Sequence, residues 1–159
     1  MQNTTPEQRL LSLGLTLPPA PPPAGLYKPV RVSDGYLYIS GQAPMQVDGS
    51  YICGRAGIDM DRDEAKAAAR QVGLTMLATI KTHYGSLDTL DALVKTLGMV
   101  NGSPDFHDYP YVINGFSELM AEVFGTEKGV GARSAVGMYL PGNVAVEIES
   151  IFKIKDGKG

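Results

Sequence analysis

Apolar and polar residues alternate with two different periods along this chain. From Lys28 to Ser40, and again from Gly131 to Glu149, the pattern changes at every second residue, as in a strand with one buried face. Residues 61–84 and 110–124 instead place apolar side chains three and four positions apart, which predicts two long amphipathic helices. Leu90–Val100 is rich in Leu and Val, and predicts a strand that is buried on much of both faces.

The N-terminal part of the chain differs from the rest. Residues 4–14 predict a short helix, in which Thr5 and Gln8 have the spacing of a capping box. Residues 17–25 contain five prolines, which fit neither a helix nor a central strand, and therefore predict an extended connector. A role of this proline run as a ligand for an aromatic groove of another protein is the less favoured alternative.

These patterns predict one folded domain. We assign residues 1–25 to the N-terminal helix and connector, 26–155 to a single domain and 156–159 to a flexible tail. The predicted order is helix, two strands, helix, strand, helix, two strands, with a tight turn at Asp34-Gly35 between the first two strands. This order indicates an α+β fold in which two helices cover one face of a mixed, mainly antiparallel sheet.

The stretch Gly131–Glu149 predicts a hairpin closed by the loop Pro141-Gly142-Asn143, whose glycine or asparagine supplies the positive φ that such loops need. Alternate apolar residues of its second strand are expected to face the helices, namely Val144, Val146 and Ile148. We therefore expect Arg133, Glu147 and Glu149 to lie together on the sheet face away from the helices.

Charged side chains on such a face have two interpretations. Either they form a solvated surface with an ion pair worth less than about 1 kcal/mol, or Arg133 binds a carboxylate and a glutamate beside it acts as a base. An arginine suits a planar carboxylate because its guanidinium donates two parallel hydrogen bonds. The three-residue loop would place Glu147 four residues along from Arg133, roughly 13 Å away at the strand rise. A pocket shared by these two residues then needs strand twist, a bulge or a neighbouring subunit.

Composition narrows the function further. The chain has 159 residues and a net charge of -3 without a basic block, which argues against a dedicated nucleic-acid binder. Its single cysteine, Cys53, excludes an intrachain disulfide and is interpreted as an incidental thiol. His83 and His107 are too far apart for a local metal motif. Neither a run of about 18 apolar residues nor a secretory signal is evident, so we expect a soluble cytoplasmic protein.

Three motifs carry a family resemblance: YISGQAP at 38–44, ARSAV at 132–136 and LPGNVAVEIESI at 140–151. On these motifs the chain resembles the YjgF-type family of reactive-intermediate deaminases, often called RidA and also labelled endoribonuclease L-PSP, and within it a longer subgroup. The resemblance extends from about Tyr27 to Ile154, and leaves the N-terminal helix and the proline run outside the family's usual extent. It implies a fold like that of bacterial chorismate mutase and a homotrimer, whose sheets form an inner barrel with clefts between subunits.

The resemblance also implies a reaction. Members hydrolyse small enamine or imine products of amino-acid dehydratases to 2-oxo acids and ammonia, as 2-iminobutanoate/2-iminopropanoate deaminases do, without cofactor or metal. Arg133 is implied to hold the substrate carboxylate, and Glu147 to position or activate the attacking water. The other residues implied to bind the substrate are Tyr27, Ser40, Gly41 through its backbone N–H, Ser134 and Ala135. In this chain Ala135 stands where the best-known deaminases carry a cysteine.

Two other functions stay open at this point. A ribonuclease would need a basic surface around the site and salt-sensitive RNA binding. A non-catalytic binder of small carboxylates would need Arg133 but not Glu147. For the deaminase, the expected partners are further copies of the chain in a homotrimer and a small carboxylate-bearing ligand, and neither a membrane nor nucleic acid is expected.

Overall fold

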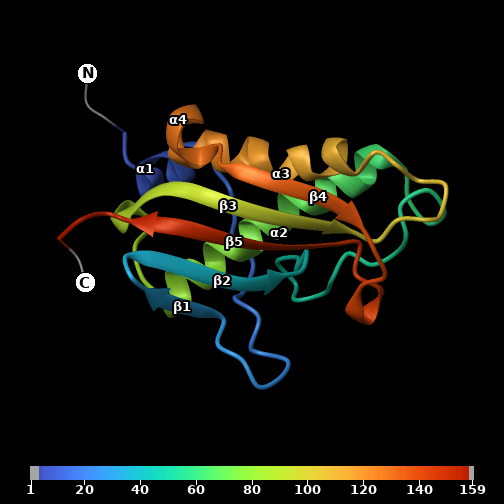
Figure 1. Ribbon diagram of the computed structural model, residues 1–159, viewed down its shortest axis with the longest axis horizontal. Coiled ribbons are helices and arrows are strands. Elements are labelled where there is room, and N and C mark those ends of the chain that lie inside the picture. The colour runs from blue at the N-terminus through green and yellow to red at the C-terminus, as the bar shows by residue number, and fades with distance from the viewer. Residues whose placement is uncertain (1–3, 158–159) are drawn as a thin grey trace.

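The computed structural model describes residues 4–157. Its elements follow the predicted order, with the short helix α4 and two 3-10 turns, η1 and η2, added (Figure 1). The elements are α1 (Pro6–Ser12), β1 (Val30–Ser33), β2 (Tyr36–Gln42), α2 (Arg62–His83), η1 (Leu87–Thr89), β3 (Leu90–Val100), α3 (Tyr109–Phe124), α4 (Thr126–Gly129), β4 (Ala132–Gly137), η2 (Pro141–Asn143) and β5 (Val146–Ile154). Of the predicted tail at 156–159, residues 158 and 159 lie outside the described residues.

Local sequence signals account for most of these elements. The predicted capping box of α1 is present, because Thr5 and Gln8 each accept the backbone N–H of the other. The tight turn between β1 and β2 has positive φ at Asp34 and Gly35 (49° and 79°), as a two-residue hairpin loop requires. α2 begins after Asp61, whose carboxylate accepts two backbone N–H groups of the first helical turn.

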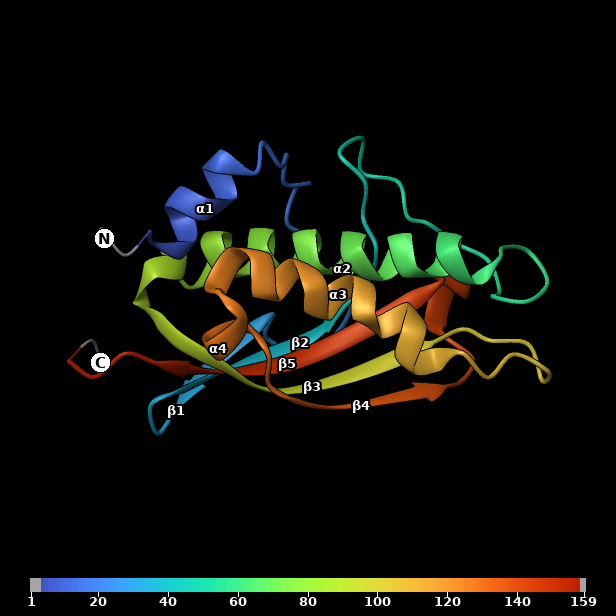
Figure 2. The same cartoon turned by 90° about the horizontal axis from the view of Figure 1, so that it is seen from above.

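The five strands form one sheet in the order β1-β2-β5-β3-β4. Neighbouring strands are antiparallel, except that β3 and β4 are parallel. α2 and α3 lie side by side on one face of the sheet, and the other face is not covered by any described helix (Figure 2). This is the predicted α+β arrangement of two helices on a mixed, mainly antiparallel sheet.

The predicted hairpin at 131–149 is wrong, because β4 and β5 do not pair with each other. β3 lies between them, so that Thr96 is opposite Arg133 on one side and Ser150 on the other. Thr96 and Ser150 are buried, and their hydroxyl oxygens lie 3.1 Å apart on the side of the sheet that faces the helices. Arg133 shares this side, so the expectation that it lies on the open face with the glutamates is also wrong.

The segment between β4 and β5 wraps around the end of β3 instead of turning tightly. Met138 donates its N–H to the carbonyl of Val100 at 2.9 Å, and the next residue after β3, Asn101, donates its N–H to the carbonyl of Ala145 at 3.0 Å. The loop still has the predicted positive φ, at both its glycine and its asparagine (63° and 55°). The apolar strand β3 can hydrogen-bond along both edges, and this connection lets it do so.

The core lies between the sheet and the two long helices. Alternate residues of β2 and β5 face the helices and are fully buried or nearly so, namely Leu37, Ile39, Val146, Ile148 and Phe152. α2 meets them with a run of small side chains, Ala65, Ala68 and Ala69, each 0% exposed. Small side chains allow a close approach of α2 to the sheet.

The N-terminal helix is fastened to the end of this core. The carboxylate of Glu7 accepts the N–H of Leu87 at 3.0 Å and binds the ammonium group of Lys81, while Leu10 is buried. From α1 the proline-rich connector passes behind the sheet and turns below β1 and β2 (Figure 1). Across residues 4–157, no helix has the length and apolar character that a membrane span needs.

α2 and α3 touch through their backbones at Gly115. A Cβ atom at this position would lie 2.1 Å from the carbonyl oxygen of Lys66, so the helices would have to separate. We expect Gly115→Ala to lower the free energy of unfolding by about 1–3 kcal/mol, because overpacking outweighs the gain in helix propensity of about 1 kcal/mol. Chemical denaturation measures this change. The control is Glu118→Ala, on the exposed side of α3, which should cost less than about 1 kcal/mol; a stabilised Gly115→Ala variant would contradict the backbone contact.

Candidate functional site

A cavity of about 620 Å³ lies where β2 and β5 meet the proline-rich connector and the loop before α2. It brings together four of the seven predicted site residues, although they come from distant segments. These residues are Tyr27, Ser40, Gly41 and Glu147. The cavity does not contain the other three predicted residues, Arg133, Ser134 and Ala135, all of which lie on β4.

Glu147 lies over a glycine at the floor of this cavity. The pairing of β2 with β5 shifts register between Ile39 and Gln42, and Gly41 lies in this irregular stretch. A Cβ atom at Gly41 would be 2.2 Å from Oε1 of Glu147. The glycine is therefore required for the glutamate to lie where it does.

The surroundings of Glu147 favour its protonated form. Burial raises the pKa of the Glu147 carboxyl, and the negative charge of nearby Glu149 raises it further. A carboxyl group whose pKa is shifted toward neutrality exchanges protons more effectively near neutral pH than an ordinary glutamate. Two carboxylates side by side with one pKa raised are typical of sites that perform acid–base chemistry.

Hydroxyl groups line the same cavity. The Tyr27 hydroxyl oxygen accepts the N–H of Ala24 at 3.1 Å, which leaves its own proton to donate. Ser40 donates its hydroxyl to the carbonyl of Lys28 at 2.7 Å, which leaves its oxygen to accept. The tyrosine and the serine thus offer one donor and one acceptor near Glu147.

Arg133 lies on the helix side of the edge strand β4. Its guanidinium donates to Oγ of Ser117 and to the carbonyl oxygen of Pro110, both at 3.0 Å. Burial lowers its pKa. Within residues 4–157, no carboxylate lies within 4.0 Å of it. An arginine has five N–H donors. Because the guanidinium donates here only to an uncharged hydroxyl and an uncharged carbonyl group, its orientation is defined but its positive charge has no counter-charge among the described residues.

One chain does not bring Arg133 and Glu147 into a common pocket. They lie on opposite sides of the sheet. On β3, Arg133 pairs with Thr96 and Glu147 pairs with Met99, so the two positions are also three residues apart along the strand. Ser134 is on the open side and Ala135 on the helix side. The outer edge of β4 has no strand beside it in the described chain. A second chain could therefore approach β4 along this edge.

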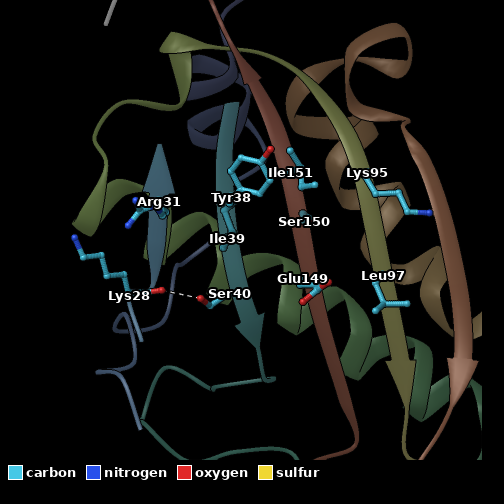
Figure 3. Close-up of a pocket in the computed structure, with 10 residues that line it drawn as sticks. All are labelled: Lys28, Arg31, Tyr38, Ile39, Ser40, Lys95, Leu97, Glu149, Ser150 and Ile151. Carbon is cyan, nitrogen blue, oxygen red and sulfur yellow. Dashed lines mark hydrogen bonds between the residues drawn. The ribbon is translucent and has the colours of Figure 1, made fainter. Parts of the chain in front are cut away.

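The open face of the sheet has a second hollow of about 380 Å³ (Figure 3). Tyr38, Leu97 and Ile151 give it an apolar floor, and cationic side chains lie around it, those of Lys28, Arg31 and Lys95. Glu149 belongs to this hollow as well as to the cavity of Glu147. Among the described residues, no group of three His, Cys, Asp or Glu side chains is placed to hold a metal ion in either hollow.

Sequence reasoning missed part of the cavity wall. Pro21, Pro22, Pro23, Tyr51 and Cys53 line the cavity but carry no motif. Cys53 was interpreted as incidental, yet it is exposed beside the cavity, where its thiol contacts the carbonyl of Gly142 at 3.6 Å. The folding of the loop before α2 against η2 brings Tyr51 and Cys53 to the cavity, and the path of the connector brings the prolines there. No local sequence pattern reports such long-range contacts.

The fold and the site define an α+β protein with two long helices on one face of a mixed sheet and a carboxyl-bearing cavity beside that sheet. The sequence model of the family described as "YjgF/chorismate mutase-like, putative endoribonuclease" matches residues 7–146. The chain belongs to this YjgF-type family, as its motifs indicated. The match begins within α1, so the proline-rich connector, which we expected outside the family's usual extent, is part of the matched region.

Relatives with similar sequences and structures span nearly the whole chain. Protein TCP17 of Trypanosoma cruzi is 37% identical over 148 residues, which are 92% of each chain. The crystal structure of a protein of unknown function from Agrobacterium tumefaciens is 40% identical with a TM-score of 0.84, and covers 95% of this chain and 94% of that one. A structure from Shewanella oneidensis, described as a putative endoribonuclease, is 29% identical with a TM-score of 0.89, and covers 94% and 99%.

The raised pKa of Glu147 makes its ionised form unfavourable in the folded state. This cost is absent below the unfolded-state pKa of about 4.3, and it is fully present once the pH exceeds the higher pKa of the folded state. We therefore expect Glu147→Gln to raise the free energy of unfolding at about pH 7, and the gain to vanish near pH 4. Chemical denaturation of both proteins at about pH 7 and at about pH 4 measures this difference in the free energy of unfolding. Glu127→Gln, at an exposed position, is the matched control and should change stability by less than about 0.5 kcal/mol at both.

Proposed function

We propose that this chain hydrolyses small imine or enamine intermediates to 2-oxo acids and ammonia, in clefts shared between neighbouring copies of a homotrimer. The observation that carries this proposal is the division of the required groups into two half-sites. One half is the cavity of Glu147, and the other is the guanidinium of Arg133 at an open sheet edge. A single chain keeps these halves on opposite sides of its sheet, so a second copy has to supply one of them.

Charge supports the same division. The residues that line the cavity include two carboxylates, Glu147 and Glu149, and no lysine or arginine. A carboxylate-bearing substrate would be repelled there unless a cation came from outside the chain. Arg133 has donors to spare and no carboxylate partner in the described residues. The arginine of a neighbouring copy is therefore the fitting partner for the substrate carboxylate.

The hydrolysis needs few groups. The guanidinium fixes the substrate carboxylate, which removes orientational freedom at the reacting carbon. The oxygen of a water molecule bonds to the carbon of the protonated imine, while the carboxylate of Glu147 accepts a proton from that water. Glu147 returns this proton to the nitrogen, and its carboxylate then accepts the remaining hydroxyl proton as the carbon–nitrogen bond breaks. Ammonia leaves, the carbonyl group of the 2-oxo acid forms, and the ammonia takes up the proton from Glu147 as ammonium. Water supplies the oxygen and no electron is gained or lost, so the reaction requires no redox cofactor.

A second candidate is an endoribonuclease, the activity in the family description. The cations Lys28, Arg31 and Lys95 around the hollow of the open face favour it (Figure 3). This reading requires RNA binding that weakens steeply with salt, together with cleavage that falls when Lys95 is replaced by alanine. The deaminase reading requires neither, because Lys95 does not line the cavity of Glu147.

Removal of the guanidinium tests the substrate half-site. We expect Arg133→Ala to lower kcat/KM by roughly 100-fold, as charge-assisted hydrogen bonds to a carboxylate are worth about 1.5–3 kcal/mol. The measurement is ammonia release from freshly generated 2-aminoacrylate. Arg70→Ala is the control, because Arg70 pairs with Glu122 on the surface away from the site. Equal rates for Arg133→Ala and the wild type would remove the deaminase proposal.

Mixing two inactive variants tests the shared cleft. We expect Glu147→Gln alone to lower kcat by about 100-fold or more, with little change in substrate binding. When Arg133→Ala and Glu147→Gln chains are co-expressed in equal amounts, about one cleft in four would combine an intact arginine with an intact glutamate. About a quarter of the wild-type activity should therefore return. If trimers that contain both variants recover no activity, the active site does not combine Arg133 of one chain with Glu147 of another, and the shared cleft is wrong. Loss of binding by Glu147→Gln would contradict its role as a base.

A further inference from the structure

The cavity of Glu147 is larger than the substrates of the proposed reaction need. Its volume is about 620 Å³. Cavities of about 300–1,000 Å³ are the size that encloses drug-sized ligands, whereas an imino acid with three or four carbons has few atoms beyond its reacting group and its carboxylate. A substrate with a small side chain would therefore fill only part of this space.

The excess space has an apolar wall. The polar groups Ser40 and Glu147 belong to the neighbouring strands β2 and β5, whereas Pro21, Pro22 and Pro23 belong to the connector. Tyr51, Cys53 and Val144 extend the apolar surface along the loop before α2 and the end of η2. Burial raises the pKa of the Tyr51 hydroxyl, so this group stays neutral. A ligand in this part of the cavity meets rings and aliphatic carbons.

Local contacts limit the conformations of the wall. Proline fixes its own φ, so a proline run loses little entropy when it is ordered. The Tyr27 hydroxyl accepts the N–H of Ala24, and the Tyr27 N–H donates to the carbonyl of Gly25 at 3.1 Å. On the opposite side, the thiol of Cys53 contacts the carbonyl of Gly142. A preformed apolar surface binds an apolar group without first having to order itself.

The charges of the cavity exclude other kinds of substituent. The residues that line it carry negative charge at Glu147 and Glu149, and no cation is among them. A phosphate or a second carboxylate at the proline wall would meet two carboxylates and no guanidinium or ammonium group. The wall and Glu147 belong to the same chain, so the wall stays beside the reacting carbon whichever copy binds the substrate carboxylate.

We propose that the substrate carries an uncharged, bulky apolar side chain, aromatic or branched aliphatic, which packs against the proline wall formed by residues 21–24 with Tyr51 and Cys53. This inference rests on the proposed function, under which the substrate is a 2-imino acid whose reacting carbon lies at Glu147. The proline-rich connector then determines specificity. The same cavity selects the benzyl group of an imine derived from phenylalanine over the methyl group of one derived from alanine.

Calorimetry with two stable 2-oxo acids, phenylpyruvate and pyruvate, tests the wall without turnover. We expect the full-length chain to bind phenylpyruvate at least about tenfold more tightly, because burial of the phenyl group is favourable. Cys53→Phe fills the apolar part of the cavity and should bring the two affinities to within about threefold. Val47→Phe adds the same ring to the same loop at a position that is exposed and outside the cavity, and should keep the preference. Ala24→Phe is the second filling variant if Cys53→Phe does not fold.

Kinetics separates this inference from the proposed function. An amino-acid oxidase generates the two imines in place from phenylalanine and alanine, and ammonia release gives kcat/KM for each. A ratio of tenfold or more in favour of the phenylalanine product supports the wall as the specificity determinant. Equal kcat/KM and equal affinities overturn the inference and leave the deaminase standing. Hydrolysis of neither imine overturns the deaminase, and the calorimetric ratio then decides by itself whether the wall selects bulky apolar acids.

Discussion

The position of β3 between β5 and β4 is the constraint on which the rest of the structure depends. Because β3 pairs with β4 on one edge and with β5 on the other, paired residues of the three strands point to the same side of the sheet. Arg133 therefore points to the same side as Thr96, toward the helices, and Glu147 points to the other side. The central strand of the core thus separates the guanidinium of Arg133 from the carboxyl group of Glu147, the two groups that the proposed function requires. A site that uses both is a property of an assembly rather than of one chain.

Glycines let side chains lie directly against the strand backbone on both sides of this sheet. On the helix side, Gly137 leaves room for the ring of Tyr109, since a Cβ atom there would lie 2.2 Å from it. On the open side, Gly41 leaves the same room for the carboxylate of Glu147. The first contact improves packing. The second keeps the carboxyl group of Glu147 partly buried and close to the negative charge of Glu149. Both effects raise the pKa of this group, and its ionisation therefore opposes folding near neutral pH. Such a cost is typical of a functional site.

The part of the chain outside the layered core completes the cavity. Pro21, Pro22 and Pro23 make no strand or helix, yet they line the space above Glu147. Glu7 and Leu10 fasten α1 to the core at one end of the connector, and β1 fastens the other end. A segment of irregular backbone between two anchored elements can be rigid without hydrogen-bonding to a sheet, because its prolines limit its conformations.

The sequence by itself determined α1, α2 and α3, the five strands and the turn at Asp34-Gly35, because caps, turn residues and the apolar period act within a few residues. It also determined that Glu147 lies on the open face, since the period of two in β5 is a local property. Only the tertiary structure decided which strands pair, because apolar alternation is satisfied equally well by several partners. The side on which Arg133 lies, and the gathering of Tyr51, Cys53 and the prolines around Glu147, followed from that long-range choice.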